Sequence, residues 1–257
     1  MSQNSSKDET PVVIPHKKWW LAIVLPLWLY VSFELAQVIL FALLKLLSML
    51  HVPLQLLNQT IANTVLSILV YLISLLIVIG VPALIFRWRT SREDLGLSRL
   101  PTWTDLIAGP VGLVLYFVLS SVLTFVAVTF FPLFNGSQPQ DTGFDGLTQG
   151  YEYVLAFVSL VIIAPIAEET LFRGYLFGKL RKLVPVWVAI LITSALFGFI
   201  HGAWNLGIDT FALSIVLCLL RLKTGSIWAS VLLHMLKNGI AFYLLFINPL
   251  LLHTLGG

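Results

Sequence analysis

The stretch APIAEETLFRG, residues 164–174, decides the fold, because it places Glu168, Glu169 and Arg173 inside a segment that is otherwise almost entirely apolar. A charged side chain is costly at membrane depth. Acids inside transmembrane segments therefore usually face a bundle interior or a water-filled cavity and serve a function. The apolar flanks predict a transmembrane helix, and the three charges predict a site within it.

The composition of the whole chain indicates a membrane protein. Of its 257 residues, 58% are hydrophobic and 11% are charged, and the mean hydropathy is +0.95. With about 20 residues needed for each crossing, a chain of this length predicts an all-α, polytopic transmembrane bundle of seven to eight helices in a lipid bilayer. The net charge of +3 is small and the basic residues lie in short connectors, so a nucleic-acid partner is not implied.

The apolar segments predict seven spans, and an eighth helix or interfacial segment in the last ten residues is left open. The polar residues 1–18 predict a disordered cytoplasmic tail, which leaves 19–257 as a single transmembrane domain. Six spans lie at about 19–50, 61–86, 105–131, 184–201, 206–220 and 226–247, and the fourth of the seven contains the charged stretch.

The connectors predict the orientation of the bundle. Residues 87–103 contain four arginines, whereas residues 132–152 contain acids but neither lysine nor arginine. Because basic connectors tend to stay in the cytoplasm, the first connector is predicted inside and the second outside. The amino terminus is then cytoplasmic.

Spacing on the fourth span separates the two glutamates. Residues four apart share a helix face, so Glu169 and Arg173 are predicted to pair, while Glu168 points about 100° away. The paired carboxylate stays charged beside the guanidinium, and the other acid faces the cavity as a general base or metal ligand. Which glutamate takes which part is left open, as is an ion network that only fixes helix packing.

Two histidines downstream add to this pattern. His201 follows Phe197 by four residues, and Gly198 beside it permits close approach of a neighbouring helix. His234 precedes Asn238 by four residues in the last span. One such histidine is usually a core residue, but two on separate spans after a pair of acids predict a shared site.

These side chains suit hydrolysis. An acid, two imidazoles and an amide can activate a water and stabilise an oxyanion without a metal. Equally, two histidines and a carboxylate could hold zinc and leave one coordination position open. A proton-coupled transporter would also place acids and histidines in the membrane, although no internal repeat supports that class.

Three ordered motifs, EExxxR, FxxxH and HxxxN, resemble those of the CPBP intramembrane proteases. This family includes the CAAX-processing endopeptidases and bacterial bacteriocin-processing or immunity proteins. The resemblance covers about residues 150–245, which we take as the catalytic core. The three blocks are Glu168–Glu169 with Arg173, Phe197 with His201, and His234 with Asn238.

The resemblance implies an endopeptidase that cuts a membrane-associated protein or peptide. In the family's scheme, the residue matching Glu168 activates a water with help from the one matching His201, and those matching His234 and Asn238 stabilise the oxyanion. The family's metalloprotease label makes the first three of these positions zinc ligands. The resemblance also implies a catalytic role for Glu169 and supporting roles for Arg173 and Phe197.

Several points stay open alongside the resemblance. It implies an integral protein of a bacterial plasma membrane, whose substrate, prenylated or not, and oligomeric state are not specified. A non-catalytic scaffold or immunity protein and a proton-coupled transporter remain the alternatives. Catalysis is expected in the last four spans, and the first three are expected to serve mainly as packing and access walls. A functional role for Glu34 in the first span is left open.

One geometric difficulty accompanies this interpretation. Counted from the predicted cytoplasmic helix ends, His234 lies about two turns deep and Glu168 about three, whereas His201 lies more than about four. Tilted or offset helices are required to bring the three side chains to one depth.

Overall fold

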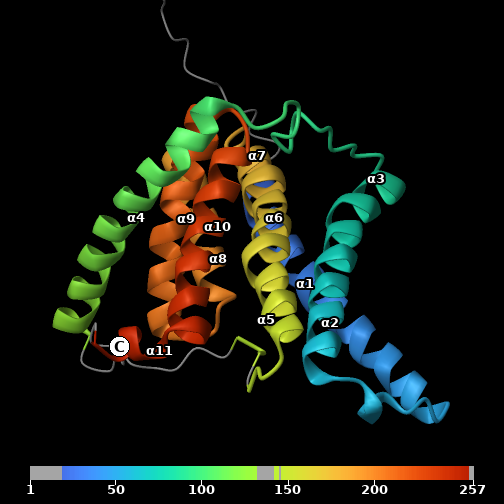
Figure 1. Cartoon of the computed structure of the whole chain (residues 1–257). Helices are drawn as coiled ribbons and strands as arrows, with labels where there is room; N and C mark the ends of the chain where they lie inside the picture. The colour runs from blue at the N-terminus through green and yellow to red at the C-terminus, as the bar shows by residue number, and fades with distance from the viewer. Residues whose placement is uncertain (1–18, 132–141, 145, 255–257) are drawn as a thin grey trace, which may run out of the picture.

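The chain forms an all-α bundle in a computed structural model, which describes residues 19–131, 142–144 and 146–254 (Figure 1). The predicted tail 1–18 and much of the predicted external connector lie outside these residues. Within the described residues there are eight continuous helices and no strand. Six of the helices are long and apolar enough to cross a membrane. This confirms the predicted all-α transmembrane class.

The helices agree with the predicted spans to within a few residues, and a short helix occupies the tail. The long helices are α1 (Leu21–Met49), α2 with α3 (Gln59–Ile85), α4 (Trp103–Phe130), α5 to α7 (Gly150–Leu180), α9 (Trp204–Thr224) and the helix Trp228–Ile247, which begins as α10 (Trp228–Phe242). The shorter ones are α8 (Val186–Phe199) and α11 (Pro249–Thr254).

Three of the long helices contain π-helical segments. The charged stretch lies where α6 (Ala164–Glu169) passes into the π-helical turn Thr170–Leu176. Proline at 165 is accommodated at the first turn of α6, where its missing amide hydrogen breaks the regular ladder. Such π segments are rare and are often found at functional sites.

The outer faces of the bundle are apolar. Phe41 on α1 and Phe125 on α4 are each 70% exposed, and Leu84 on α3 is 85% exposed. Large exposed apolar surfaces of this kind are matched by lipid. Trp19 and Trp103 stand at helix ends, the usual position of an aromatic anchor at the membrane interface.

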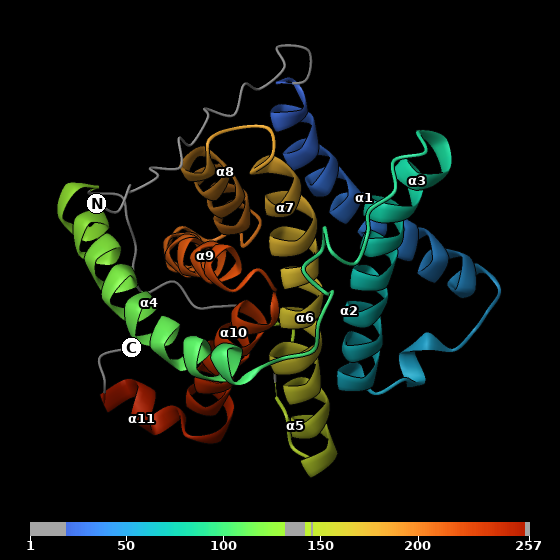
Figure 2. The same cartoon turned by 90° about the horizontal axis from the view of Figure 1, so that it is seen from above.

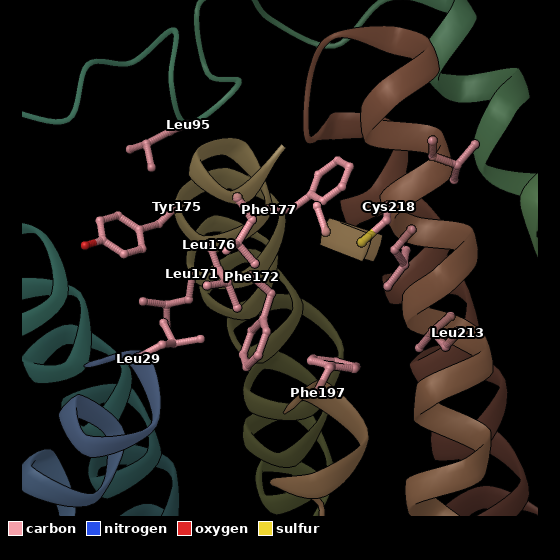
Figure 3. Close-up of a cluster of buried hydrophobic side chains, with 14 of the residues drawn as sticks. Leu29, Leu95, Leu171, Phe172, Tyr175, Leu176, Phe177, Phe197, Leu213 and Cys218 are labelled. Atoms are coloured by element: carbon pink, nitrogen blue, oxygen red, sulfur yellow. The ribbon is translucent and has the colours of Figure 1, made fainter. Parts of the chain in front are cut away.

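The core surrounds the carboxyl-terminal half of the helix Gly150–Leu180. Phe172 and Phe177 are almost fully buried among the side chains of α8 and α9 (Figure 3). Seen from above, α9 lies among α4, α8 and α10 (Figure 2). The charged stretch therefore leads directly into the buried core.

The arginine-rich connector crosses one end of this core. Lys182 Nζ lies 2.8 Å from Asp94 Oδ1, and Ser226 Oγ donates to the Gly96 carbonyl at 3.0 Å. The hydrogen bonds from Lys182 and from the Ser91 amide hold the pKa of the Asp94 carboxyl well below its usual value. Three basic connectors thus meet at the same end, as the predicted alternation of spans requires.

Two glycines allow the connector to lie directly on the helix Gly150–Leu180. A Cβ atom at Gly178 would lie 2.8 Å from the Asp94 carbonyl oxygen, and one at Gly174 would lie 3.0 Å from that of Leu95. A side chain at either position would push the connector backbone away.

We expect Gly178→Ala to lower the free energy of unfolding by about 1–3 kcal/mol, because the new methyl group overpacks against backbone that cannot rotate away. The measurement is thermal unfolding of purified protein in detergent. Gly80→Ala is the matched control, since a Cβ there meets nothing within 4 Å. Equal melting temperatures for the two variants would contradict the close connector contact.

Candidate active site

A buried ion pair lies at the centre of the site. Arg173 Nη1 donates to Glu169 Oε1 at 3.0 Å, and both side chains are fully buried. His234 Nδ1 lies 2.9 Å from the same oxygen. Because an ionised carboxylate only accepts hydrogen bonds, Nδ1 carries the hydrogen. The predicted pairing along the helix is therefore present, and Glu169 also orients an imidazole from α10.

Phe197 joins the charged groups to the histidines. Its ring centroid lies 4.3 Å from the Arg173 guanidinium carbon, 4.8 Å from the His201 ring and 5.9 Å from the His234 ring. A desolvated cation over an aromatic face gains about 2 kcal/mol. The Phe197 ring also packs against the Phe172 ring, with 4.9 Å between the two ring centroids (Figure 3). The phenylalanine of the FxxxH block thus separates and positions three polar side chains.

Glu168 occupies a different environment from its neighbour. Its side chain is 13% exposed, and Oε2 lies 3.8 Å from His234 Nε2, which is beyond hydrogen-bonding distance. The Tyr71 hydroxyl donates to Glu168 Oε1 at 2.5 Å. One carboxylate oxygen therefore remains available beside the imidazole.

The remaining predicted residues approach the same region. His201 Nδ1 lies 2.6 Å from the Phe197 carbonyl oxygen, so it carries the hydrogen and leaves Nε2 available. The Phe197 ring packs against the His201 ring at 4.8 Å and against the His234 ring at 5.9 Å, so both histidines lie beside the same aromatic side chain. Asn238 Nδ2 donates to the Leu160 carbonyl at 2.9 Å, which uses one of its two amide hydrogens.

Close approach of α8 and α9 sets the position of His201. A Cβ at Gly198 would lie 2.6 Å from the Gly207 carbonyl oxygen, so the two backbones touch there, as the sequence suggested for Gly198. Gly202, with a φ of +75°, makes the turn between the helices. His201 is held between these two points.

Contacts between helices bring the two histidines together despite the unequal counts. The Phe197 ring packs against the His201 ring at 4.8 Å and the His234 ring at 5.9 Å. α8 has 14 residues, which span about 21 Å, so it is shorter than a bilayer of about 30 Å. The turn before α10 is tied to the connector, where the Ile227 amide donates to the Gly96 carbonyl.

The first three spans contribute more than walls. Tyr71 was not among the predicted site residues. It is the only tyrosine of the second span, and a single phenol hydroxyl in an apolar helix was the sequence feature that could have indicated its role. On the third span, the Tyr116 and Ser120 hydroxyls donate to Asp209 Oδ1 at 2.6 and 2.7 Å. The expectation that these spans serve mainly as packing was therefore incomplete.

The expected zinc ligands are Glu168, His201 and His234. No group of three histidine, cysteine or acidic side chains that could hold a metal ion is found among the residues with described positions. His201 and His234 each direct Nδ1 at a protein acceptor, so Nε2 is the nitrogen of each ring that could bind a metal. Zinc assistance stays a prediction.

Comparison with known proteins supports the motif assignment. Residues 150–240 match the family model described as type II CAAX prenyl endopeptidase Rce1-like. An uncharacterised 24.3 kDa protein of Escherichia coli is 32% identical over 89 residues, 33% of this chain and 41% of that protein. YdiL of Bacillus subtilis (strain 168) is named provisionally as a membrane peptidase. It is 31% identical over 77 residues, which are 30% of this chain and 32% of YdiL.

A further relative is named as a protease. The membrane-embedded CAAX protease MroQ of Staphylococcus aureus (strain USA300) is 28% identical over 99 residues, 36% of this chain and 39% of that protein. The chain thus spans from about a third to two fifths of the length of these relatives. No solved structure matches. The predicted resemblance is confirmed over the region that holds the site.

We expect Arg173→Ala to lower the free energy of unfolding by about 3–5 kcal/mol, because it leaves the buried Glu169 carboxylate without its guanidinium. Lys182→Ala is the control, since its exposed pair with Asp94 contributes at most about 1 kcal/mol. Thermal unfolding in lipid nanodiscs compares the two. A loss for Arg173→Ala no larger than that of the control would contradict the assigned role of the pair.

Proposed function

We propose that this integral membrane protein is an intramembrane endopeptidase that hydrolyses a peptide bond of a membrane-associated protein or peptide, with Glu168 as general base. The observation that carries the proposal is the unequal environment of two adjacent acids. Glu169 is enclosed and bonded to Arg173 and His234, whereas Glu168 is partly exposed and has one oxygen available. One acid organises the site, and the other is free to react.

The proposed first step is activation of a water. Tyr71 uses Glu168 Oε1, so Oε2 can accept one hydrogen of the water. His201 Nε2 can accept the other, because Nδ1 is committed to the Phe197 carbonyl. This double acceptance aims an oxygen lone pair at the substrate carbonyl. Glu168 takes the proton as the carbon–oxygen bond forms, and it returns the proton to the leaving amide nitrogen as the carbon–nitrogen bond breaks.

The negative oxygen of the tetrahedral intermediate needs donors. Glu169 fixes the His234 ring through Nδ1, much as the acid of a hydrolytic triad orients its histidine. Asn238 can offer the oxyanion the amide hydrogen that Leu160 does not use. His234 adds an Nε2–H donor when its ring, which lies between the Glu169 and Glu168 carboxylates, is an imidazolium that carries a hydrogen on each nitrogen. Donors held in place before the reaction stabilise such charge most effectively.

The family match supports this class, because it spans all three motif blocks. MroQ is named as a protease of CAAX type, and this name supports peptide-bond hydrolysis for the present chain. We further propose a bacterial plasma membrane, with the amino terminus in the cytoplasm, from the family and the arginine-rich connector. The proposed scheme does not require zinc, prenylation of the substrate or a partner subunit.

Glu168→Gln is expected to lower kcat by about 10²–10⁴-fold, because the amide keeps the shape but cannot take a proton. The measurement is cleavage of membrane-anchored fluorogenic peptides in proteoliposomes, with mass spectrometry of the products. Glu93→Gln, an exposed change in the connector, is the matched control. Wild-type turnover in Glu168→Gln would reject Glu168 as the general base, and absence of cleavage by the wild-type protein would reject the protease proposal.

The same preparation separates the competing classes. A chelator should leave the rate unchanged, whereas loss restored by added zinc would establish a metal-assisted reaction. A scaffold would retain its biological effect in Glu168→Gln. A carrier would show uptake driven by a pH gradient and yield no cleavage product.

Tyr71→Phe should lower kcat about tenfold with little change in KM, because it removes a hydrogen bond to the charged base but leaves the substrate path intact. The exposed Tyr243→Phe is the control and should behave as wild type. An effect confined to KM would show that Tyr71 acts on substrate binding rather than on the base.

A further inference from the structure

A groove of about 710 Å³ lies between α1 and the junction of α8 with α9. Tyr30, Phe33 and Glu34 line it from α1, and Ile200, Gly202 and Phe211 line it from the opposite side. Most of its surface is aromatic or aliphatic. Its volume suits an extended peptide segment or a similar ligand.

The groove adjoins the candidate active site at two points. Ile200 and Gly202 are the chain neighbours of His201. On the α1 side, the Phe33 ring packs edge-on against the Tyr71 ring at 5.9 Å, and the Tyr71 hydroxyl donates to Glu168. A ligand lying in the groove would therefore continue toward the side chains assigned to water activation.

Glu34 is the unusual residue of this groove. It lies in the middle of α1, its side chain is exposed, and it has no ion-pair partner among the residues whose positions the structure describes. Tyr30, one turn earlier, also lines the groove and carries no positive charge. An uncompensated acid at membrane depth is costly and usually marks a functional position.

Three other acids within the spans are paired with a cationic side chain of the protein. Asp105 pairs with Arg99, Asp209 with Lys237, and Glu169 with Arg173. Glu34 differs in that its charge faces an open groove. A cation brought by a ligand would supply the missing partner.

We infer that the groove holds a segment of the substrate peptide next to the cleaved bond and that Glu34 binds a lysine or arginine side chain of that segment. This inference rests on the proposed endopeptidase function, because it names the substrate class of the same site. The apolar walls accommodate the other side chains, and the Gln37 amide beside Glu34 can hydrogen-bond to the peptide backbone. Glu34 is then a specificity-determining residue.

The test measures binding separately from hydrolysis. Glu168→Gln protein in phosphatidylcholine nanodiscs is titrated with fluorescent peptides that carry one apolar anchor. The peptides differ at a single position, occupied by lysine, norleucine or glutamate, and this position is moved along the peptide. At one position, lysine should bind about tenfold more tightly than norleucine, as expected for a charge pair shielded from bulk water.

Substitutions of Glu34 on this background give the decisive comparison. Glu34→Gln should bring the lysine-to-norleucine affinity ratio close to one, and Glu34→Lys should reverse the preference in favour of glutamate. Glu93→Gln removes the same charge outside the groove and should keep the ratio. Equal binding of lysine and norleucine at every position, or a preference that survives Glu34→Gln, would overturn the inference.

Two further arms separate the remaining outcomes. If adding phosphatidylethanolamine abolishes the lysine preference, an amine headgroup occupies the groove and the peptide assignment is overturned. With Glu168 intact, cleavage without lysine preference rejects only the role of Glu34. Lysine-selective binding without any cleavage instead rejects the protease and retains the groove as a site for cationic peptides.

Discussion

The requirement that a charge in a bilayer be compensated within the protein governs this structure. Arg173 and Glu169 meet this requirement for each other, and the pair is completed by the Phe197 ring on one side and the His234 imidazole on another. The residues that supply these contacts come from three separate helices. Contacts to this one buried ion pair thus hold α8 and α10 against the helix Gly150–Leu180, and the candidate site forms around the pair.

A second problem is depth. A count of residues from predicted helix ends places the two histidines and Glu168 at unequal levels. The arginine-rich connector lies across glycines 174 and 178 and is hydrogen-bonded to the turn before α10. α8 is short, and His201 follows its end by two residues. The Phe197 ring of α8 packs against both histidine rings, so contacts between helices, and not counts along the chain, bring these groups together.

The two kinds of acid in the spans suggest how such a site can be both stable and reactive. Asp105 and Glu169 are held by arginines and contribute to the packing of the bundle. Glu168 is partly exposed and Glu34 lines the groove, and neither is paired with an arginine or lysine in the described part of the chain. The acids that pair with arginine thus support the packing, whereas the two acids without such a pair lie where a substrate is proposed to meet the protein.

The sequence by itself determined the all-α transmembrane class, the spans to within a few residues and the Glu169–Arg173 pairing, because hydropathy and helical spacing are local properties of the chain. It also indicated which histidines to consider, through their spacing on separate spans. Only the tertiary structure decided that Glu168 is the acid left available, that Tyr71 reaches it from the second span, and that Glu34 faces a groove beside His201. These facts depend on helix offsets and on contacts between residues far apart in the chain, which no local pattern encodes.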